Sequence, residues 1–582
     1  MNESRIERLG WVFAAMAFVF VLAVPRYPYL LDEVDFVKAG LRAGRAGSLQ
    51  YYAGEEAPAI SGLWHPPTYI GTIGATTRIL GETRRATTFP GAASFAVTLV
   101  LLLLFSRKWF PDDPAGRGLV LILFSTCPLA LAAPLLIEID TSWLTPALLW
   151  SLNLLESASL PTLMLCFCGC LSLKMTTPLL LPVAVVFYRT RSRSWFAGAT
   201  EGAAVLFGGG LIFVLLWKLV SFGLSLEFSF PFEHTFINSL QKGAALEKSF
   251  QIAGFEIGGG LYKLLYKLWM GKNVIFWVGP GLLALALAGS LNMERWIHPI
   301  TGSHLIFLWA TFFGYLLIRA TVGGFPKYVV PIIPLLILPV VNFIRLKLLN
   351  RELWRLLAAG FALALFMSLM PDSFESLLRT DRRLVLDVVK CGAIQVGSTA
   401  LMSFFMAGLI IERKTFSNLA IGGLLIHTIG WGCSQTVRLW SPERSVLYCY
   451  GDRGIRATAD RIKQDLTGDR IAIMPKDLAT LVGSRYYGLR PATYTVADFE
   501  KWLADENTIW FIDRLWAESD LDKFPVAREK VLQYFVEVER QNSYRLFKRK
   551  SLTQVVTPAV VTPAMTSASQ ADGKGLLPEN SP

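Results

Sequence analysis

Three carboxylates stand within four residues of one another, at Asp32, Glu33 and Asp35, directly after the first apolar stretch of the chain. That stretch runs from about residue 9 to residue 24 and approaches the ~20 apolar residues that a helix needs to cross a bilayer. A carboxylate at a membrane face can accept a proton from a hydroxyl or hold a metal ion against a phosphate. The cluster therefore predicts chemistry at this face, and the alternative interpretation is ordinary interfacial charge.

Other ionisable residues adjoin the ends of later apolar stretches, where their cost makes a functional role the default interpretation. They are Glu138, Asp140, Lys174, Arg319 and Lys327, with Tyr328 beside the last, and His65 lies later in the same loop as the three carboxylates. Acids and cations together suit a hydroxyl nucleophile and a phosphate leaving group. Each also has a structural alternative: a turn for His65, a helix cap for Asp140, snorkelling for Lys174, and interfacial anchoring for Lys327 with Tyr328.

The amino-acid composition indicates a membrane protein. Of 582 residues, 53% are hydrophobic and only 17% charged, and the mean hydropathy is +0.45. Long apolar runs indicate a polytopic helical protein, because a spanning segment must satisfy its own backbone hydrogen bonds. A net charge of +12 fits the Lys and Arg of cytoplasmic loops, and the chain lacks the basic stripe with interleaved aromatics that is typical of nucleic-acid binding.

Hydropathy and the Lys/Arg bias predict about 13 transmembrane helices, with a cytoplasmic N-terminus and the C-terminal region outside. The expected spans lie near residues 9–24, 89–105, 119–137, 143–155, 160–173, 178–188, 198–220, 272–290, 303–320, 327–345, 354–370, 391–411 and 418–437. Residues 160–188 are read as two short helices divided at Lys174, because this places the basic stretch 189–193 inside. The membrane domain then covers residues 1–437.

Two outer loops and a C-terminal domain complete the expected organisation. Residues 26–88 and 221–271 mix aromatic, glycine and charged residues, which predicts interfacial helices. Residues 438–550 alternate strand-like and helical patterns, which predicts a small extracytoplasmic α/β domain with a mainly parallel sheet. The expected strands are 445–450, 470–474, 492–496, 508–512 and 544–548, with helices that include 457–466 and 526–536. The tail, residues 551–582, has the composition of a disordered segment.

Several motifs, in this order and on one side of the membrane, resemble the GT-C-type glycosyltransferases that use polyprenyl-phosphate sugars. The relatives are the lipid A aminoarabinose transferases and the protein O-mannosyltransferases. The segments 31–36 (LDEVDF), 65–69 (HPPTY), 140–141 (DT), 169–174 (GCLSLK) and 327–334 (KYVVPIIP) carry the resemblance, which covers roughly residues 1–345. It implies a GT-C fold.

The resemblance also implies a mechanism. A sugar on a polyprenyl phosphate would pass to a hydroxyl of a lipid, glycan or protein at the outer face, in one inverting displacement. Asp32 would be the general base, and Glu33 would orient the acceptor or Asp32. Lys174, Lys327 and Arg319 would neutralise the departing phosphate. The residues expected to bind substrate are Asp35, His65, Asp140, Lys174, Arg319, Lys327 and Tyr328.

A divalent metal ion is a further expectation, since some relatives bind metal near this site; His65 and Asp140 would hold it. Asp35 stands where the mannosyltransferases commonly have His, so the acceptor class stays open. The expected location is the bacterial inner membrane, and no nucleic-acid partner is expected. The alternative function is a polytopic lipid or solute transporter or flippase, which should show paired repeats or charges near the midplane.

Overall fold

The structure is a computed structural model. It describes residues 3–24, 32–51, 62–63, 65–228, 250–252, 255–257, 271–291, 299–319, 326–369, 385–440, 454–482, 486–488, 496–514, 528–541 and 544–550. The side chains of Asp32 and Arg319 lie outside this part, as do most of the 221–271 loop, the expected strand 445–450 and the whole 551–582 tail. The same is true of residues 492–495 of the expected strand 492–496, whose last residue begins a helix.

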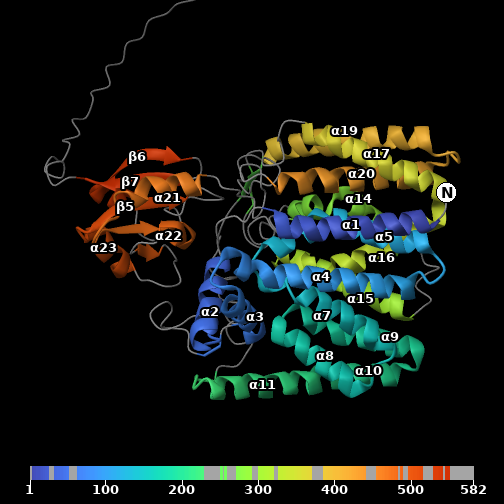
Figure 1. Ribbon diagram of the computed structural model, residues 1–582, viewed down its shortest axis with the longest axis horizontal. Helices are drawn as coiled ribbons and strands as arrows, with labels where there is room; N and C mark the ends of the chain where they lie inside the picture. Colours follow the sequence, from blue (N-terminus) through green and yellow to red (C-terminus); the bar gives the residue numbers. More distant parts are fainter. Residues whose placement is uncertain are drawn as a thin grey trace, which may run out of the picture.

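Helices lying side by side form the larger part of the molecule (Figure 1). The first half contains α1 (Glu3–Ala23), α2 (Asp32–Ala46), α3 (Pro67–Leu80), α4 (Arg84–Trp109), α5 (Pro114–Thr126), α6 (Pro128–Ala132), α7 (Leu144–Asn153), α8 (Leu160–Leu173), α9 (Leu181–Ser192), α10 (Trp195–Ala204) and α11 (Gly210–Gly223). Short 3₁₀ or π turns join them at η2 (Ala133–Leu135), η3 (Ile139–Thr141), η4 (Leu154–Glu156), η5 (Thr177–Leu180) and η6 (Val205–Gly209). The strands β1 (Phe250–Ile252) and β2 (Phe255–Ile257) form an antiparallel pair.

The second half of the bundle contains α14 (Pro280–Ser290), α15 (Pro299–Arg319), η8 (Lys327–Ile332), α16 (Ile333–Lys347), α17 (Asn350–Leu369), α19 (Val385–Ile410) and α20 (Phe416–Arg438). Proline stands in the first turn of many of these helices, including α3, α5, α8 and α14, where its missing N–H breaks no helical bond. Within the described residues, five helices are long and apolar enough to cross a membrane, or seven if each of two bent pairs counts as one span. The molecule is therefore a helical membrane protein, while the expected total of about 13 spans stays a prediction.

Two expected spans are bent rather than straight. The segment 119–137 breaks at Cys127, where α5 and α6 meet at 60°. The segment 272–290 turns by 94° at Gly279, whose φ of +97° suits glycine. Pro280 has no N–H for the carbonyl of Phe276, four residues earlier, and the indole of Trp431 donates to that carbonyl instead at 2.8 Å. A side chain of α20 thus supplies the hydrogen bond that Pro280 cannot donate to the Phe276 carbonyl, as burial in a membrane requires.

Several ion pairs join the ends of neighbouring helices, and one of them includes Glu7 of α1, whose start lies at the end of the bundle that contains the N-terminus (Figure 1). We call this the basic end, defined by the pairs Glu7–Arg117, Lys108–Glu156, Asp113–Arg345, Arg189–Glu201 and Arg351–Glu412. Arg189 also donates to the carbonyl of Ala158 at 3.3 Å, so the end of α9 lies beside the start of α8. The two helices therefore form a hairpin with Lys174 at its far turn, which agrees with the expectation of two short helices.

The C-terminal domain is an α/β unit at the opposite end of the bundle (Figure 1). Its elements are α21 (Ile455–Lys463), β3 (Ile471–Met474), α22 (Lys476–Val482), β4 (Tyr486–Gly488), α23 (Val496–Ala504), β5 (Thr508–Arg514), α24 (Arg528–Tyr534), β6 (Phe535–Gln541) and β7 (Tyr544–Arg549). The five-stranded sheet has the order β4-β3-β5-β7-β6. Lys38 of α2 donates to the phenol of Tyr486 at 3.3 Å, which ties this domain to the segment between α1 and α4.

The expected mainly parallel sheet is wrong in part. Strand β3 is parallel to β4 and β5, but β7 is antiparallel to both β5 and β6. The expected helix 526–536 ends at Tyr534, and β6 follows at once. Residues 536–539 alternate apolar and charged side chains, a period-2 pattern that indicates a strand. Because β6 and β7 are so close in the sequence, they pair antiparallel, as the two strands of a hairpin do.

Candidate functional site

The carboxylate of Glu33 fixes helix α2 to two other parts of the bundle. It is 1% exposed and accepts the backbone N–H of Ile137 at 2.8 Å. The guanidinium of Arg84, at the start of α4, pairs with the same oxygen at 3.3 Å. A buried carboxylate needs such partners to remain ionised. Glu33 therefore holds the start of α2, where Asp32 is the first helical residue, against the segment that precedes η3.

The segment around His65 returns to the same helix. The imidazole ring lies 4.5 Å from the ring of Tyr51, edge to face, and 5.6 Å from the ring of Phe36. Phe36 also packs edge to face on Tyr69, at 5.3 Å. The adjacent prolines explain the direction of the chain, because Pro67 opens α3 and sends Tyr69 into the core. The structure thus brings His65 against α2 through aromatic packing on Phe36, which follows the buried Asp35 in the sequence.

Tyr69 links the α2 carboxylate to the next acidic segment. Burial holds the pKa of its phenol well above the ordinary value, and the nearby charges of Glu138 and Glu33 raise that pKa further. The phenol therefore stays protonated at any physiological pH and remains a hydrogen-bond donor. Residues from α2, α3 and the segment before η3 consequently share one electrostatic environment.

Two buried ion pairs form the centre of the site. Lys174 Nζ lies 2.8 Å from Asp140 Oδ2, and Lys327 Nζ lies 3.0 Å from Glu138 Oε2. Asp140 is fully buried and Glu138 is 1% exposed, so both pairs are shielded from solvent. Glu138 and Asp140 come from one short segment, and η3 packs on η8, which begins with Lys327. The predicted convergence of Lys174 and Lys327 is therefore present in the structure.

The ring of Tyr328 lies close to both ammonium groups. Lys174 Nζ is 5.2 Å and Lys327 Nζ 5.8 Å from its centroid, within the range of cation–π attraction. Tyr315 stacks on Tyr328 at 4.8 Å and 10°, and its hydroxyl is within 2.6 Å of Thr177 Oγ1. This stack joins α15 and η8 to the turn after Lys174. Both lysines are consequently held close to one rigid aromatic surface.

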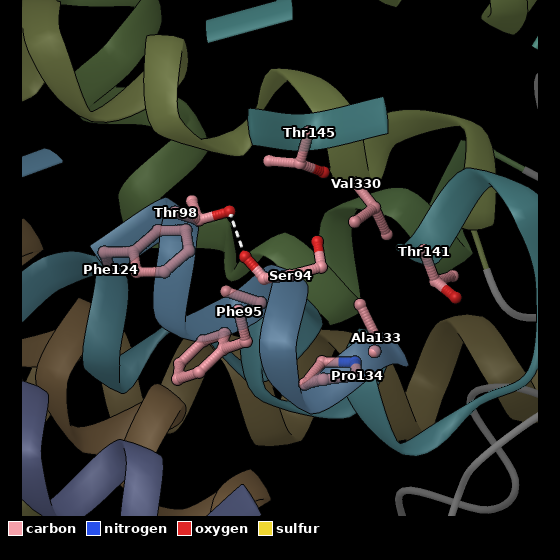
Figure 2. Close-up of a pocket in the computed structure, with 11 residues that line it drawn as sticks. Ser94, Phe95, Thr98, Phe124, Ala133, Pro134, Thr141, Thr145 and Val330 are labelled. Atoms are coloured by element: carbon pink, nitrogen blue, oxygen red, sulfur yellow. Dashed lines mark hydrogen bonds between the residues drawn. The ribbon is translucent and has the colours of Figure 1, made fainter. Parts of the chain in front are cut away.

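A small cavity lies beside this network (Figure 2). Its volume of about 20 Å³ would admit a water molecule. Four hydroxyl residues line it, Ser94, Thr98, Thr141 and Thr145, among otherwise mainly apolar neighbours. Figure 2 shows them converging from α4, η3 and α7. Thr141 Oγ1 donates to the carbonyl of Glu138 at 3.1 Å, so the cavity wall also shapes the segment that holds the two acids.

The expected metal ion does not fit the described part of the site. No group of three or more His, Cys, Asp or Glu that could hold a metal occurs among the described residues. The Lys174 ammonium lies 2.8 Å from Asp140 Oδ2 and would repel a metal cation bound to that carboxylate. The involvement of His65 and Asp140 in metal binding stays a prediction without support here, and no step below depends on a metal. The role predicted for Arg319, which ends α15, falls outside the described side chains.

Three residues that the structure places in the site have no specific role in the sequence analysis, although Glu138 is among its candidates. Glu138 was recognisable as an acid at the end of an apolar stretch, and its spacing of two from Asp140 was the available signal. Arg84 precedes a long span, where a basic residue usually marks topology. Tyr315 lies inside an apolar helix, and no local pattern indicates that it faces Tyr328.

Comparison with known proteins supports the fold. Two crystal structures of ArnT from Cupriavidus metallidurans share the architecture, one bound to undecaprenyl phosphate and one in the apo state. The first is 17% identical with a TM-score of 0.54, covering 92% of this chain and 98% of that one. The second is 16% identical with a TM-score of 0.54, covering 94% and 99%. No family model and no curated protein sequence matches. The chain therefore has the GT-C fold that the motifs implied.

Proposed function

We propose that this chain is a membrane glycosyltransferase that moves a hexosyl or pentosyl group from a polyprenyl-phosphate donor to a hydroxyl acceptor. The observation that carries the proposal is the meeting of Lys174 and Lys327 at Tyr328, at the same end of the bundle as the acidic helix α2. Paired cations suit a phosphate leaving group, and a nearby carboxylate suits a hydroxyl nucleophile. The shared fold with an ArnT structure that holds undecaprenyl phosphate supports the same reading.

In the proposed reaction Asp32 takes the proton of the acceptor hydroxyl, whose oxygen attacks the anomeric carbon. The bond from that carbon to the phosphate oxygen breaks, so the configuration inverts in one displacement. Lys174 and Lys327 stabilise the charge that grows on the lipid phosphate. Glu33 acts through its bonds to Arg84 and Ile137, which position α2. The acceptor is a lipid, glycan or protein hydroxyl.

We propose the following topology for this enzyme: about 13 spans in a bacterial inner membrane, with the N-terminus and the basic end in the cytoplasm and the C-terminal α/β domain outside. The Lys/Arg bias supports it. Arg191 is an exposed residue of the basic end, and Glu82 is exposed near the site end. An impermeant maleimide applied to intact cells should label Glu82→Cys and leave Arg191→Cys unlabelled, against the background of the unmodified protein. The reverse pattern would reject the orientation.

The reaction itself is tested with purified full-length protein, a radiolabelled polyprenyl-phosphate sugar and an extract of envelope glycolipids as acceptor. Asp32→Asn should lower the rate by about 10²–10⁴, because the amide cannot take the proton. Asp112→Asn removes a similar charge at the basic end and is the matched control, expected to keep the normal rate. Near-normal turnover in Asp32→Asn would reject Asp32 as the base.

A flippase or transporter is the second candidate. It predicts movement of lipid or solute across vesicles without any broken glycosidic bond. Mass spectrometry of the reaction products separates the two, since only a transferase yields free polyprenyl phosphate together with a glycosylated acceptor. Donor translocation with no such products would replace the proposal.

A further inference from the structure

Both lysines that face Tyr328 already have a carboxylate partner inside the protein. Lys327 pairs with Glu138 at 3.0 Å, and Lys174 pairs with Asp140 at 2.8 Å. The two positive charges are thus balanced by two negative charges within one buried cluster. A phosphate that approaches these lysines enters a neutral network rather than a free cationic pocket.

The carboxylates cannot easily move away. Thr141 donates from its backbone N–H and its hydroxyl to the carbonyl of Glu138, at 3.2 and 3.1 Å, so a tight turn holds the segment. Asp140 is fully buried within that turn, which packs on η8. Each ammonium, by contrast, has three N–H donors, and a single carboxylate oxygen does not use all three. The lysines can therefore share their donors with a second anion while the acids stay in place.

From this geometry we infer that Glu138 and Asp140 are positioning residues that compete with the lipid phosphate for Lys327 and Lys174. The inference rests on the proposed function and deepens it. A donor phosphodiester carries one negative charge, and the released polyprenyl phosphate carries up to two. The internal carboxylates repel any phosphate at the lysines, and they repel the dianionic product more strongly than the singly charged donor. The network therefore limits how tightly the released polyprenyl phosphate is held and favours its departure from the site.

Binding of polyprenyl phosphate to the full-length protein in nanodiscs tests the inference directly. Glu138→Gln keeps the shape of the side chain and removes the competing charge, so we expect at least about tenfold tighter binding. Asp140→Asn should act in the same direction through Lys174. Glu352→Gln is the matched control, because Glu352 is equally buried but accepts backbone N–H groups of Leu349 and Glu412 at the basic end. It should leave the affinity unchanged.

Turnover kinetics separate the proposed competition from a merely structural role, which would not lower KM for the donor. Glu138→Gln should lower both KM for the donor and kcat, because the donor and the released phosphate are both held too tightly. Adding Lys327→Ala to Glu138→Gln should abolish the gain in affinity. Weaker or unchanged phosphate binding in both Glu138→Gln and Asp140→Asn would overturn the inference. Should Glu138→Gln not fold, Asp140→Asn decides alone.

The two proposals fail in different ways. Tighter phosphate binding in the variants, with no sugar transfer by the unmodified protein, would support competition at the lysines and reject the glycosyltransferase. Normal sugar transfer by the unmodified protein, with no gain in phosphate affinity in the variants, would support the glycosyltransferase and reject competition at the lysines. Absence of any polyprenyl phosphate binding by the unmodified protein overturns the inference as well.

Discussion

The two ends of the helix bundle use the same kinds of charged residue in different ways. At the basic end the exposure of the pairs varies: Lys108 and Glu156 are 40% and 43% exposed and Arg351 and Glu412 are 58% and 43% exposed, whereas Arg189 and Glu201 are 8% and 15% exposed. At the site end, by contrast, Glu33, Glu138 and Asp140 are all 1% exposed or less. Exposed pairs contribute little to stability, whereas a buried charge requires a fixed partner. Burial therefore separates the acids of the candidate site from the two most exposed ion pairs of the basic end, although single acids such as Glu352 are equally buried there.

The largest expected effect comes from removing the lysines at the site end. Lys174→Ala or Lys327→Ala should each lower turnover by about 10²–10³, the usual effect of losing one group that stabilises a developing anion. The double change should cost less than the product of the two, since both lysines serve one phosphate beside Tyr328. Lys347→Ala, an exposed lysine of the basic end, is the control and should retain activity. If the loss of turnover in the double variant equalled the product of the two single losses, the two lysines would not act on one shared phosphate.

The anchoring carboxylate of α2 should affect stability as well as activity. Glu33→Gln leaves Arg84 without its charged partner inside the protein, and we expect a loss of about 3 kcal/mol in the free energy of unfolding. Thermal unfolding of the detergent-solubilised protein measures it. A combined Glu33→Gln and Arg84→Met variant should recover part of the loss, because no unpaired charge remains. A single variant as stable as the unmodified protein would show that Glu33 does not anchor α2.

Trp431 allows a test away from both charged ends. Trp431→Phe preserves an aromatic ring against Phe276 and His427 but removes the N–H that satisfies the Phe276 carbonyl. An unsatisfied buried carbonyl costs about 1–3 kcal/mol. Trp195→Phe, at an indole that is 73% exposed, is the control and should be near neutral in the same thermal assay. Equal stability of the two variants would mean that the 94° bend does not depend on the indole.

The smallest effect is expected at the basic end. Lys108→Ala removes an exposed pair with Glu156 and should change the free energy of unfolding by no more than about 1 kcal/mol. Its effect should shrink further in high salt, which screens exposed charges. A loss as large as that of Glu33→Gln would remove the distinction between the two ends.

Much of the site was predictable from local sequence, but its connections were not. The acidic cluster at Asp32 and the lysines at 174 and 327 stand out because ionisable residues beside apolar stretches are costly. Tyr315 and Arg84 did not stand out, since a tyrosine within a span and an arginine before one have ordinary explanations. The mixed sheet was missed for a similar reason: β6 begins directly where α24 ends, so no turn residue announces it.

The class of protein, the approximate positions of the apolar helices that the structure describes, and the acidic segment at the start of α2 all followed from the sequence alone. These properties depend on hydropathy and charge along short segments of the chain. The pairing of each acid with its lysine is instead set by tertiary packing. Glu138 and Lys327 are 189 residues apart, and their 3.0 Å contact exists because η3 packs on η8. Such a pairing depends on how separate helices pack, and no local pattern encodes it.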